Sequence, residues 1–167
     1  MLSYEPAGIK PDLVVLGKSL SGGLYPVSAV LGRREVMDTV VPSQYGSTFS
    51  GNPIACAVVK AAVDVIQDEK LVQRAYELGM KLEERLSNIR SSSLDRVQGV
   101  GLFWSLFTKG PLGTANRLVT LLQERGIFTN TTGERIRIAP PLVIEEAELM
   151  SAIDTLAECL QLLEKRD

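Results

Sequence analysis

The first third of the chain alternates short apolar runs with polar and glycine-rich segments. Asp12–Leu16 is a run of β-branched and other apolar residues, which is typical of a strand buried on both faces. Pro26–Leu31 has a similar character and predicts a second strand, and Arg33–Val40 predicts a short helix. This order of elements is typical of an α/β layer.

Two helices are predicted in the middle of the chain. Asn52 followed by Pro53 indicates a helix start, with an amide N-cap and a proline at the first helical position. The helix expected over Ile54–Gln67 is almost entirely apolar, and we therefore expect it to be buried. A second helix is expected from Asp68 to about Ile89, because leucines recur there at helical spacing with charged residues between them.

The pattern changes at Leu94, where shorter segments begin. Val97–Gly101 and Leu102–Thr108 predict either a pair of strands or one bent strand. An amphipathic helix is expected over Thr114–Arg125, with Gly126 as the glycine that ends it. The remaining expected elements are strands at Ile127–Thr131 and Arg135–Ala139 and a closing helix at Glu145–Lys165.

These patterns predict three parts. Residues 1–67 are expected to form the end of an α/β sheet domain, and residues 68–93 a connecting helix. Residues 94–167 are expected to form a small C-terminal α+β domain, because their amphipathic segments need a common core.

Composition and charge exclude several classes of protein. Hydrophobic residues make up 45% of the 167 residues and charged residues 23%, so a folded globular protein is expected and a disordered one is excluded. The net charge of −2 provides no field that attracts nucleic acid or an anionic membrane. No apolar run reaches the roughly 20 residues that span a bilayer. We therefore expect no nucleic acid and no membrane among the partners of this chain.

The chain contains no histidine, which restricts its chemistry. Ser-His-Asp triads, Cys-His pairs and histidine-bearing metal sites cannot be built, and no metal site is predicted. Cys56 and Cys159 each lie in an apolar helical pattern and are expected to be buried free thiols. Catalysis must then use lysine, carboxylates, hydroxyls or a cofactor.

Lys18 is the strongest candidate for such chemistry. It lies where the first predicted strand meets a small-residue loop, Ser19–Gly23, and partial desolvation there favours the neutral, nucleophilic amine. Such an amine condenses with an aldehyde, and pyridoxal phosphate is a common partner. The alternative interpretation is a surface lysine at the end of a strand. A phosphate-binding P-loop is set aside because Asp12 stands where that motif requires its first glycine.

Pro11–Gly23 resembles the lysine segment of the class III aminotransferases, which are pyridoxal-phosphate-dependent enzymes of fold type I. Gly22–Ala29, which contains Tyr-Pro-Val-Ser, resembles the ornithine-specific branch of that class. The resemblance continues through Gly46–Pro53 and Arg135–Ile144 and covers nearly the whole chain in family order. It implies an α/β fold, made of the C-terminal part of a fold-type I large domain followed by a small α+β C-terminal domain.

The resemblance also implies roles for single residues. Lys18 would hold pyridoxal 5'-phosphate as a Schiff base and then move a proton between the substrate Cα and the cofactor. Ser47 and Thr48 would bind the cofactor phosphate, Thr48 that of the neighbouring subunit, and they precede a helix N-terminus, which attracts anions. Arg137 would grip the substrate α-carboxylate, which suits a planar guanidinium. Without the resemblance, Thr48 would be interpreted as a turn residue and Arg137 as an exposed strand residue.

The implied reaction transfers the δ-amino group of ornithine to 2-oxoglutarate, giving glutamate semialdehyde and glutamate, in a homodimer or higher homo-oligomer. An acetylornithine or 4-aminobutyrate aminotransferase is the first alternative. A catalytically inactive fragment is the second, because the family is much longer and most of its cofactor-binding groups lie in the part with no counterpart here. The first residues do not resemble a targeting peptide, and a cytoplasmic location is expected, with the mitochondrial matrix as the alternative.

Two residues depart from the family pattern. Tyr45 stands where histidine is common, and Ser50 where glycine is usual. Both lie near the expected phosphate-binding segment, and we expect them to tighten it.

Overall fold

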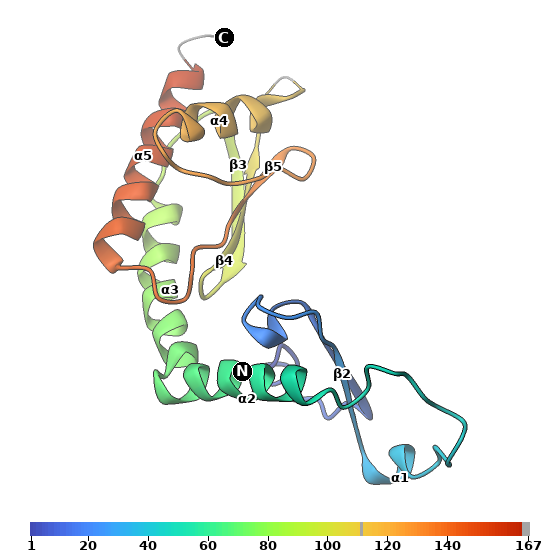
Figure 1. The fold of residues 1–167 in the computed structure, drawn as a ribbon. Helices are drawn as coiled ribbons and strands as arrows, with labels where there is room; N and C mark the ends of the chain where they lie inside the picture. Colours follow the sequence, from blue (N-terminus) through green and yellow to red (C-terminus); the bar gives the residue numbers. More distant parts are fainter. Residues whose placement is uncertain (111, 165–167) are drawn as a thin grey trace. The chain divides into compact units, whose positions relative to one another are not determined.

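A computed structural model describes residues 1–110 and 112–164 (Figure 1). The chain divides into two compact units, Met1–Val72 and Gln73–Asp167, and each is described by itself. Both mix helices and strands, as an α/β chain is expected to do.

The first unit is built on a two-stranded sheet. Strands β1 (Leu13–Leu16) and β2 (Ala29–Gly32) pair antiparallel, with Leu13 opposite Gly32. The 3-10 helix η1 (Lys18–Ser21) follows β1 directly, and the short helix α1 (Arg34–Met37) follows β2. Gly32 has no room for a side chain, because a Cβ there would lie 2.6 Å from the sulfur of Met37.

Helix α2 (Pro53–Asp68) begins as predicted. The side-chain oxygen of Asn52 accepts hydrogen bonds from the backbone N–H groups of Ile54 at 2.9 Å and Ala55 at 3.3 Å. Two of the N–H groups that a helix start leaves without helical partners are therefore satisfied.

The burial predicted for this unit is wrong. Of the α2 residues only Ala55 is buried, and Ile54, Val65 and the thiol of Cys56 are exposed. The expectation that β1 is buried on both faces also fails, because Val15 is 76% exposed. The physical reason is that, besides α2, the described part of this unit contains one two-stranded sheet, a 3-10 helix and the short helix α1, too little to cover both faces of an apolar strand and helix.

The second unit holds a continuous core. Its strands β3 (Leu94–Val100), β4 (Phe103–Thr108) and β5 (Arg135–Ile138) form an antiparallel sheet in the order β3-β4-β5. Its helices are α4 (Thr114–Gln123), α5 (Glu146–Glu164) and most of α3 (Leu71–Ser87). The core side chains include Leu82, Leu86, Trp104, Leu106, Leu118, Ile136, Leu156 and Leu160.

Helices α3 and α5 lie side by side in this unit, and both contribute to its core (Figure 1). Lys81 on α3 forms an ion pair with Glu146 on α5 at 2.6 Å, and Arg85 pairs with Asp154. These exposed pairs lie beside the leucine contacts, and the burial of the leucines accounts for most of the packing energy.

Two strand predictions are resolved by the structure. Residues 97–108 form a hairpin and not one bent strand, with a two-residue turn at Gly101 and Leu102 and Val100 opposite Phe103. The strand predicted at Ile127–Thr131 does not form, and only Thr131 makes an isolated bridge, to Ile136. Beyond that bridge the segment meets β5 through the Asn130 carbonyl and the Thr129 hydroxyl, both of which bond the backbone of Arg137. The end of the predicted closing helix, Lys165, lies outside the described residues.

Candidate active site

Lys18 begins η1, and Gly17 separates it from the end of β1. Its backbone has φ 55°, a left-handed conformation that residues other than glycine seldom adopt. The side chain is exposed, so the partial desolvation expected at this position is not present in the described unit. An exposed amine is nevertheless accessible to an aldehyde.

The loop after Lys18 is held by Ser21, which sequence reasoning did not select. The Ser21 side chain is 1% exposed, and its hydroxyl donates to the Tyr25 carbonyl at 2.5 Å and accepts from the Tyr25 N–H at 3.2 Å. Gly22 and Gly23, between them, have φ values of 65° and 85°, which glycine adopts without strain. The buried Ser21 hydroxyl therefore holds this glycine loop together with backbone hydrogen bonds, and the only sequence signal was a serine before two glycines.

Residues 45–52 form a turn that leads into α2. The Ser47 hydroxyl accepts a hydrogen bond from the Phe49 N–H at 3.3 Å, and Thr48 is exposed beside it. The two departures from the family pattern contact each other, since the Tyr45 and Ser50 hydroxyls lie 3.0 Å apart. This hydrogen bond joins the two sides of the turn, and the tightening expected of the two residues stays a prediction.

A pocket of about 980 Å³ lies between residues 25–29, the 45–52 turn and the start of α2. Tyr25, Ser47 and Asn52 provide polar groups in its lining, and the Asn52 amide lies 3.5 Å from the Tyr25 hydroxyl. The pocket lies at the N-terminus of α2, where the helix dipole and the lining hydroxyl groups suit an anion such as a phosphate. Leu20 lines the pocket, whereas Lys18 and Thr48 do not.

Arg137 belongs to the second unit. It lies on β5 opposite Ser105, and its guanidinium carbon is 5.4 Å from the centroid of the Phe103 ring. Its backbone N–H donates to the Asn130 carbonyl at 3.1 Å, and its carbonyl accepts from the Thr129 hydroxyl. These bonds fix the backbone at Arg137 and leave the guanidinium exposed.

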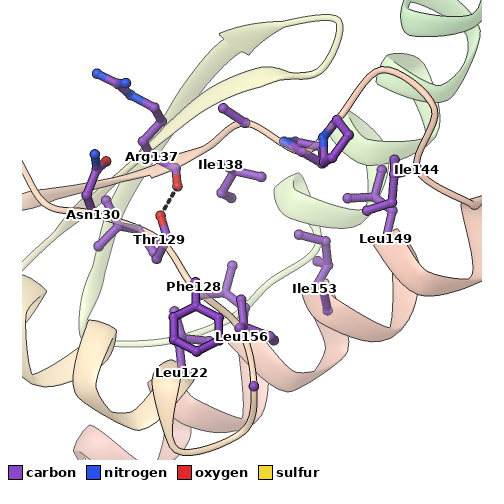
Figure 2. Close-up of a pocket in the computed structure, with 17 residues that line it drawn as sticks. Leu122, Phe128, Thr129, Asn130, Arg137, Ile138, Ile144, Leu149, Ile153 and Leu156 are labelled. Carbon is purple, nitrogen blue, oxygen red and sulfur yellow. Dashed lines mark hydrogen bonds between the residues drawn. The ribbon is translucent and has the colours of Figure 1, made fainter. Parts of the chain in front are cut away.

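Arg137 also borders an apolar groove of about 760 Å³ between the 126–130 segment, β5 and α5. Figure 2 shows Leu149, Ile153 and Leu156 of α5 on one side of the groove, with the guanidinium of Arg137 directed away from them. Apart from Arg137, the lining residues carry no ionisable side chain. The groove itself therefore supplies shape and apolar surface and no catalytic group.

Glu134 is a further anchored residue that sequence reasoning missed. Its carboxylate accepts hydrogen bonds from the backbone N–H groups of Gly113 at 2.9 Å and Ala115 at 3.3 Å and from the Thr108 hydroxyl at 3.3 Å. These hydrogen bonds hold the pKa of Glu134 below its ordinary value, and the bond from the Gly113 N–H has the largest effect. The carboxylate thus joins the start of β5 to the start of α4 and supports the strand that carries Arg137.

The predicted site residues fall in different units. Lys18, Ser47 and Thr48 belong to Met1–Val72, and Arg137 belongs to Gln73–Asp167. Within residues 1–110 and 112–164, no group of three or more His, Cys, Asp or Glu side chains could hold a metal ion. None of the described helices is long and apolar enough to cross a membrane.

Comparison with known proteins gives the family. The family model described as "Aminotransferase class-III" matches residues 1–160. The chain is 45% identical over 158 residues to an ornithine aminotransferase of Emericella nidulans, an alignment that covers 92% of this chain and 35% of that protein. It is 42% identical over 172 residues to an ornithine aminotransferase of Saccharomyces cerevisiae, with coverage of 98% and 41%. The chain thus spans well under half the length of these curated relatives.

Solved structures of aminotransferases share the fold of this chain. An acetylornithine aminotransferase from Elizabethkingia anophelis superposes with a TM-score of 0.92 at 40% identity, over 96% of this chain and 41% of that one. An ornithine aminotransferase from Toxoplasma gondii superposes with a TM-score of 0.91 at 36% identity, over 99% of this chain and 40% of that one. Because the family model matches almost the whole of this chain, the chain belongs to the class III aminotransferase family.

Proposed function

We propose that the chain supplies part of the active site of a pyridoxal-phosphate-dependent aminotransferase that moves the δ-amino group of ornithine to 2-oxoglutarate. The observation that carries the proposal is the match of residues 1–160 to the class III family, together with curated relatives named ornithine aminotransferase. The products of this transfer are glutamate semialdehyde and glutamate.

The residues of the first unit fit the cofactor in their chemistry. Lys18 provides an accessible primary amine, and the pocket at the start of α2 provides hydroxyl and amide donors suited to the cofactor phosphate. When bound, pyridoxal phosphate draws electrons away from the substrate Cα and so eases loss of its proton. The part assigned to Lys18 is to hold the cofactor and to carry that proton at its Nζ atom.

Ser47 and Thr48 are proposed to bind the phosphate. Both precede α2, and the Ser47 hydroxyl already lines the pocket. Thr48 is exposed and does not line that pocket, which suits the role that the family resemblance implies, toward the cofactor of a neighbouring subunit in a homodimer or higher homo-oligomer.

Arg137 is proposed to bind the substrate α-carboxylate. Its guanidinium is exposed, and the structure describes no carboxylate within ion-pair distance of it. A guanidinium without an internal carboxylate partner can form two parallel hydrogen bonds with a substrate carboxylate.

A different amino donor is the main alternative within the class. The acetylornithine and ornithine aminotransferase structures superpose almost equally well, so the fold does not favour either donor. The names of the curated relatives and the Tyr-Pro-Val-Ser segment favour ornithine. We further propose that residues 1–67 belong to a large domain, 68–93 to a connecting helix and 94–167 to a small domain, and that the protein acts in the cytoplasm.

We also propose that the 167-residue chain does not transaminate by itself. The curated relatives are more than twice as long, and the family resemblance assigns the ring-stacking and ring-nitrogen groups to their remaining part. Lys18 alone would then hold the cofactor weakly.

The test of this function is capture of the cofactor by Lys18. The chain is mixed with an equal concentration of pyridoxal phosphate, reduced with borohydride and digested, and the labelled lysine is identified by mass spectrometry. Because any accessible amine can react, the expected result is a site preference, with Lys18 labelled well above exposed lysines such as Lys60 and Lys109.

Two variants make the result interpretable. Lys18→Ala should remove most of the label, while the matched Lys109→Ala should leave it unchanged. Labelling spread evenly over the lysines would show that Lys18 has no cofactor-binding role, and turnover of ornithine by the wild-type chain would contradict its proposed dependence on groups outside these residues.

A further inference from the structure

Tyr25 connects the segment that follows Lys18 with the start of α2. At its backbone, the buried Ser21 hydroxyl donates to the Tyr25 carbonyl at 2.5 Å and accepts from the Tyr25 N–H at 3.2 Å. At its side chain, the hydroxyl accepts a hydrogen bond of 3.5 Å from the Asn52 amide. Ser21 belongs to η1, the 3-10 helix that begins at Lys18. One half-buried tyrosine is therefore bonded both to the element that carries Lys18 and to the residue before α2.

Asn52 uses the two ends of its amide for different partners. The oxygen accepts from the N–H groups of Ile54 and Ala55 and so caps α2, whereas the amide nitrogen donates to the Tyr25 hydroxyl. The cap alone does not require an amide, because serine or aspartate caps a helix about equally well. The part of Asn52 that the cap does not use is thus the part bonded to Tyr25.

Packing places the same loop against α2. A Cβ added at Gly22 would lie 3.7 Å from the Cβ of Ala62, an ordinary van der Waals distance. Leu20 and Tyr25 line the pocket at the start of α2, although Lys18 itself does not. The lysine segment and the pocket are therefore neighbours within one compact unit, and Tyr25 is hydrogen-bonded to residues of both.

The spacing between these two segments matters for a ligand with two ends. An aldehyde that reacts with Lys18 and also places a phosphate in the pocket needs both segments at once. If the two segments were not held together, binding of such a ligand would have to order them at a cost in conformational entropy. An aldehyde without a phosphate depends on Lys18 alone. A link between the segments therefore favours the two-ended ligand and leaves the other unaffected.

We propose that Tyr25 and Asn52 are a pair of positioning residues that hold the Lys18 segment and the phosphate pocket at a fixed spacing. This inference rests on the proposed function, in which Lys18 and the pocket serve the same cofactor. The pair acts through the hydrogen bond between the Tyr25 hydroxyl and the Asn52 amide, and neither side chain carries a proton in the reaction.

The test compares the capture of pyridoxal phosphate and of pyridoxal by the 167-residue chain. The two aldehydes differ only in the phosphate, which pyridoxal lacks. The chain is titrated with each aldehyde and reduced with borohydride, and mass spectrometry of the digest gives the concentration at which Lys18 is half labelled. Loss of a hydrogen bond weakens binding by roughly twofold to tenfold. We therefore expect Tyr25→Phe to raise this concentration about threefold for pyridoxal phosphate and to leave it unchanged for pyridoxal.

A second variant tests whether the two residues act as a pair. Asn52→Ser keeps an oxygen that caps α2 and removes the amide nitrogen, so it should have the same effect as Tyr25→Phe. If both act through one hydrogen bond, the double variant is no weaker than either single variant. Independent contacts with the aldehyde would multiply the two losses and would overturn the inference. Tyr76→Phe is the matched control, because Tyr76 is 60% exposed and lies outside the pocket, and it should alter neither capture.

Pyridoxal separates positioning from a general structural role. An equal loss with both aldehydes in Tyr25→Phe would show that the hydroxyl only stabilises the fold, and unaltered capture of both would show that it has no role. Either result overturns the inference and leaves the assignment of Lys18 in place. Failure of the proposed function is seen in the wild-type chain instead, as labelling of Lys18 no stronger than that of the exposed Lys60.

Discussion

Glu134 replaces a capping group that α4 lacks. The residue before the helix is Gly113, which has no side chain to accept from the first N–H groups. Glu134 reaches them from the start of β5, a position 21 residues later in the chain. A glycine at an N-cap followed much later by an acid has no local sequence signature, which is why this contact was not predicted.

The lowered pKa of Glu134 leads to a prediction about acid stability. A carboxyl whose folded-state pKa lies below its ordinary value of 4.5 stabilises the fold above that value. This contribution is lost as the pH falls through the lower, folded-state pKa. We expect Glu134→Gln to lower the melting temperature at pH 7 by a few degrees and to make its decline toward pH 3 shallower than in the wild type.

Thermal unfolding between pH 3 and pH 7 measures both effects. Glu83→Gln is the matched control, since Glu83 is an exposed acid on α3, and it should reproduce the wild-type curve. Wild-type and Glu134→Gln curves that run parallel across this range would show that ionisation of Glu134 does not contribute to stability.

Tyr45 and Ser50 show what a residue-level prediction from sequence lacks. Each was recognised singly as a departure from the family pattern, whereas the structure brings their hydroxyls within 3.0 Å. A hydrogen bond between residues five apart in a turn depends on the path of the backbone. The sequence alone therefore identifies the two unusual residues but does not predict that they contact each other.

Among the elements, the packing of α3 on the β3-β4 hairpin depends on two glycines. A Cβ at Gly79 would lie 2.5 Å from the Cα of Gly101 and 2.6 Å from its carbonyl oxygen. Gly101 itself has φ 56° in the hairpin turn. The helix and the turn can approach this closely only because neither residue has a side chain.

This geometry predicts that Gly79→Ala destabilises the chain. In an exposed helix the change would stabilise by up to about 1 kcal/mol through helix propensity. Here the added methyl meets backbone atoms, and overpacking of this kind costs typically 1–3 kcal/mol. We expect the free energy of unfolding, measured by urea denaturation, to fall by roughly that amount.

Met80→Ala, at the exposed neighbouring position, is the control and should change the stability little. A Gly79→Ala chain at least as stable as the wild type would mean that α3 and the hairpin are not in close contact in solution.

Helices were predicted better than strands. Leucines at helical spacing predicted α3, α4 and α5, because one apolar face per helix is a local property of the sequence. The segment 127–131 has the apolar and β-branched residues of a strand, yet only Thr131 pairs, in one bridge with Ile136. Strand formation requires a regular ladder of backbone hydrogen bonds, and here the Arg137 carbonyl bonds the Thr129 side chain.

For the molecule as a whole, burial is unevenly distributed. The continuous leucine-rich core lies in Gln73–Asp167, and its residues include Leu149, Ile153 and Leu160, each at most 3% exposed. In Met1–Val72 large apolar side chains such as Val15 are exposed. Local opening is least costly where little apolar surface is buried.

We therefore predict slow amide exchange in Leu149–Leu163 of α5 and fast exchange in β1 and β2, as measured by hydrogen–deuterium exchange with mass spectrometry. Leu160→Ala, which removes a fully buried side chain, should cost about 2–5 kcal/mol and speed exchange across α5. The matched control Leu112→Ala changes a side chain that is 95% exposed, and it should alter neither the stability nor the exchange of α5. Rapid exchange throughout α5 in the wild type would contradict the core described here.

The sequence by itself determined the helices, the capping of α2 and the family. The helices and the cap depend on residues close together in the chain, and the family is recognised from several motifs in the family's order. It also selected Lys18, Ser47, Thr48 and Arg137 as candidates. The tertiary structure decided which apolar segments are buried, the hairpin in place of a bent strand, and the Glu134 bridge to α4. It also brought the Tyr25 hydroxyl within 3.5 Å of the Asn52 amide. The physical reason is that burial and cross-strand pairing depend on residues far apart in sequence, whose proximity only folding creates.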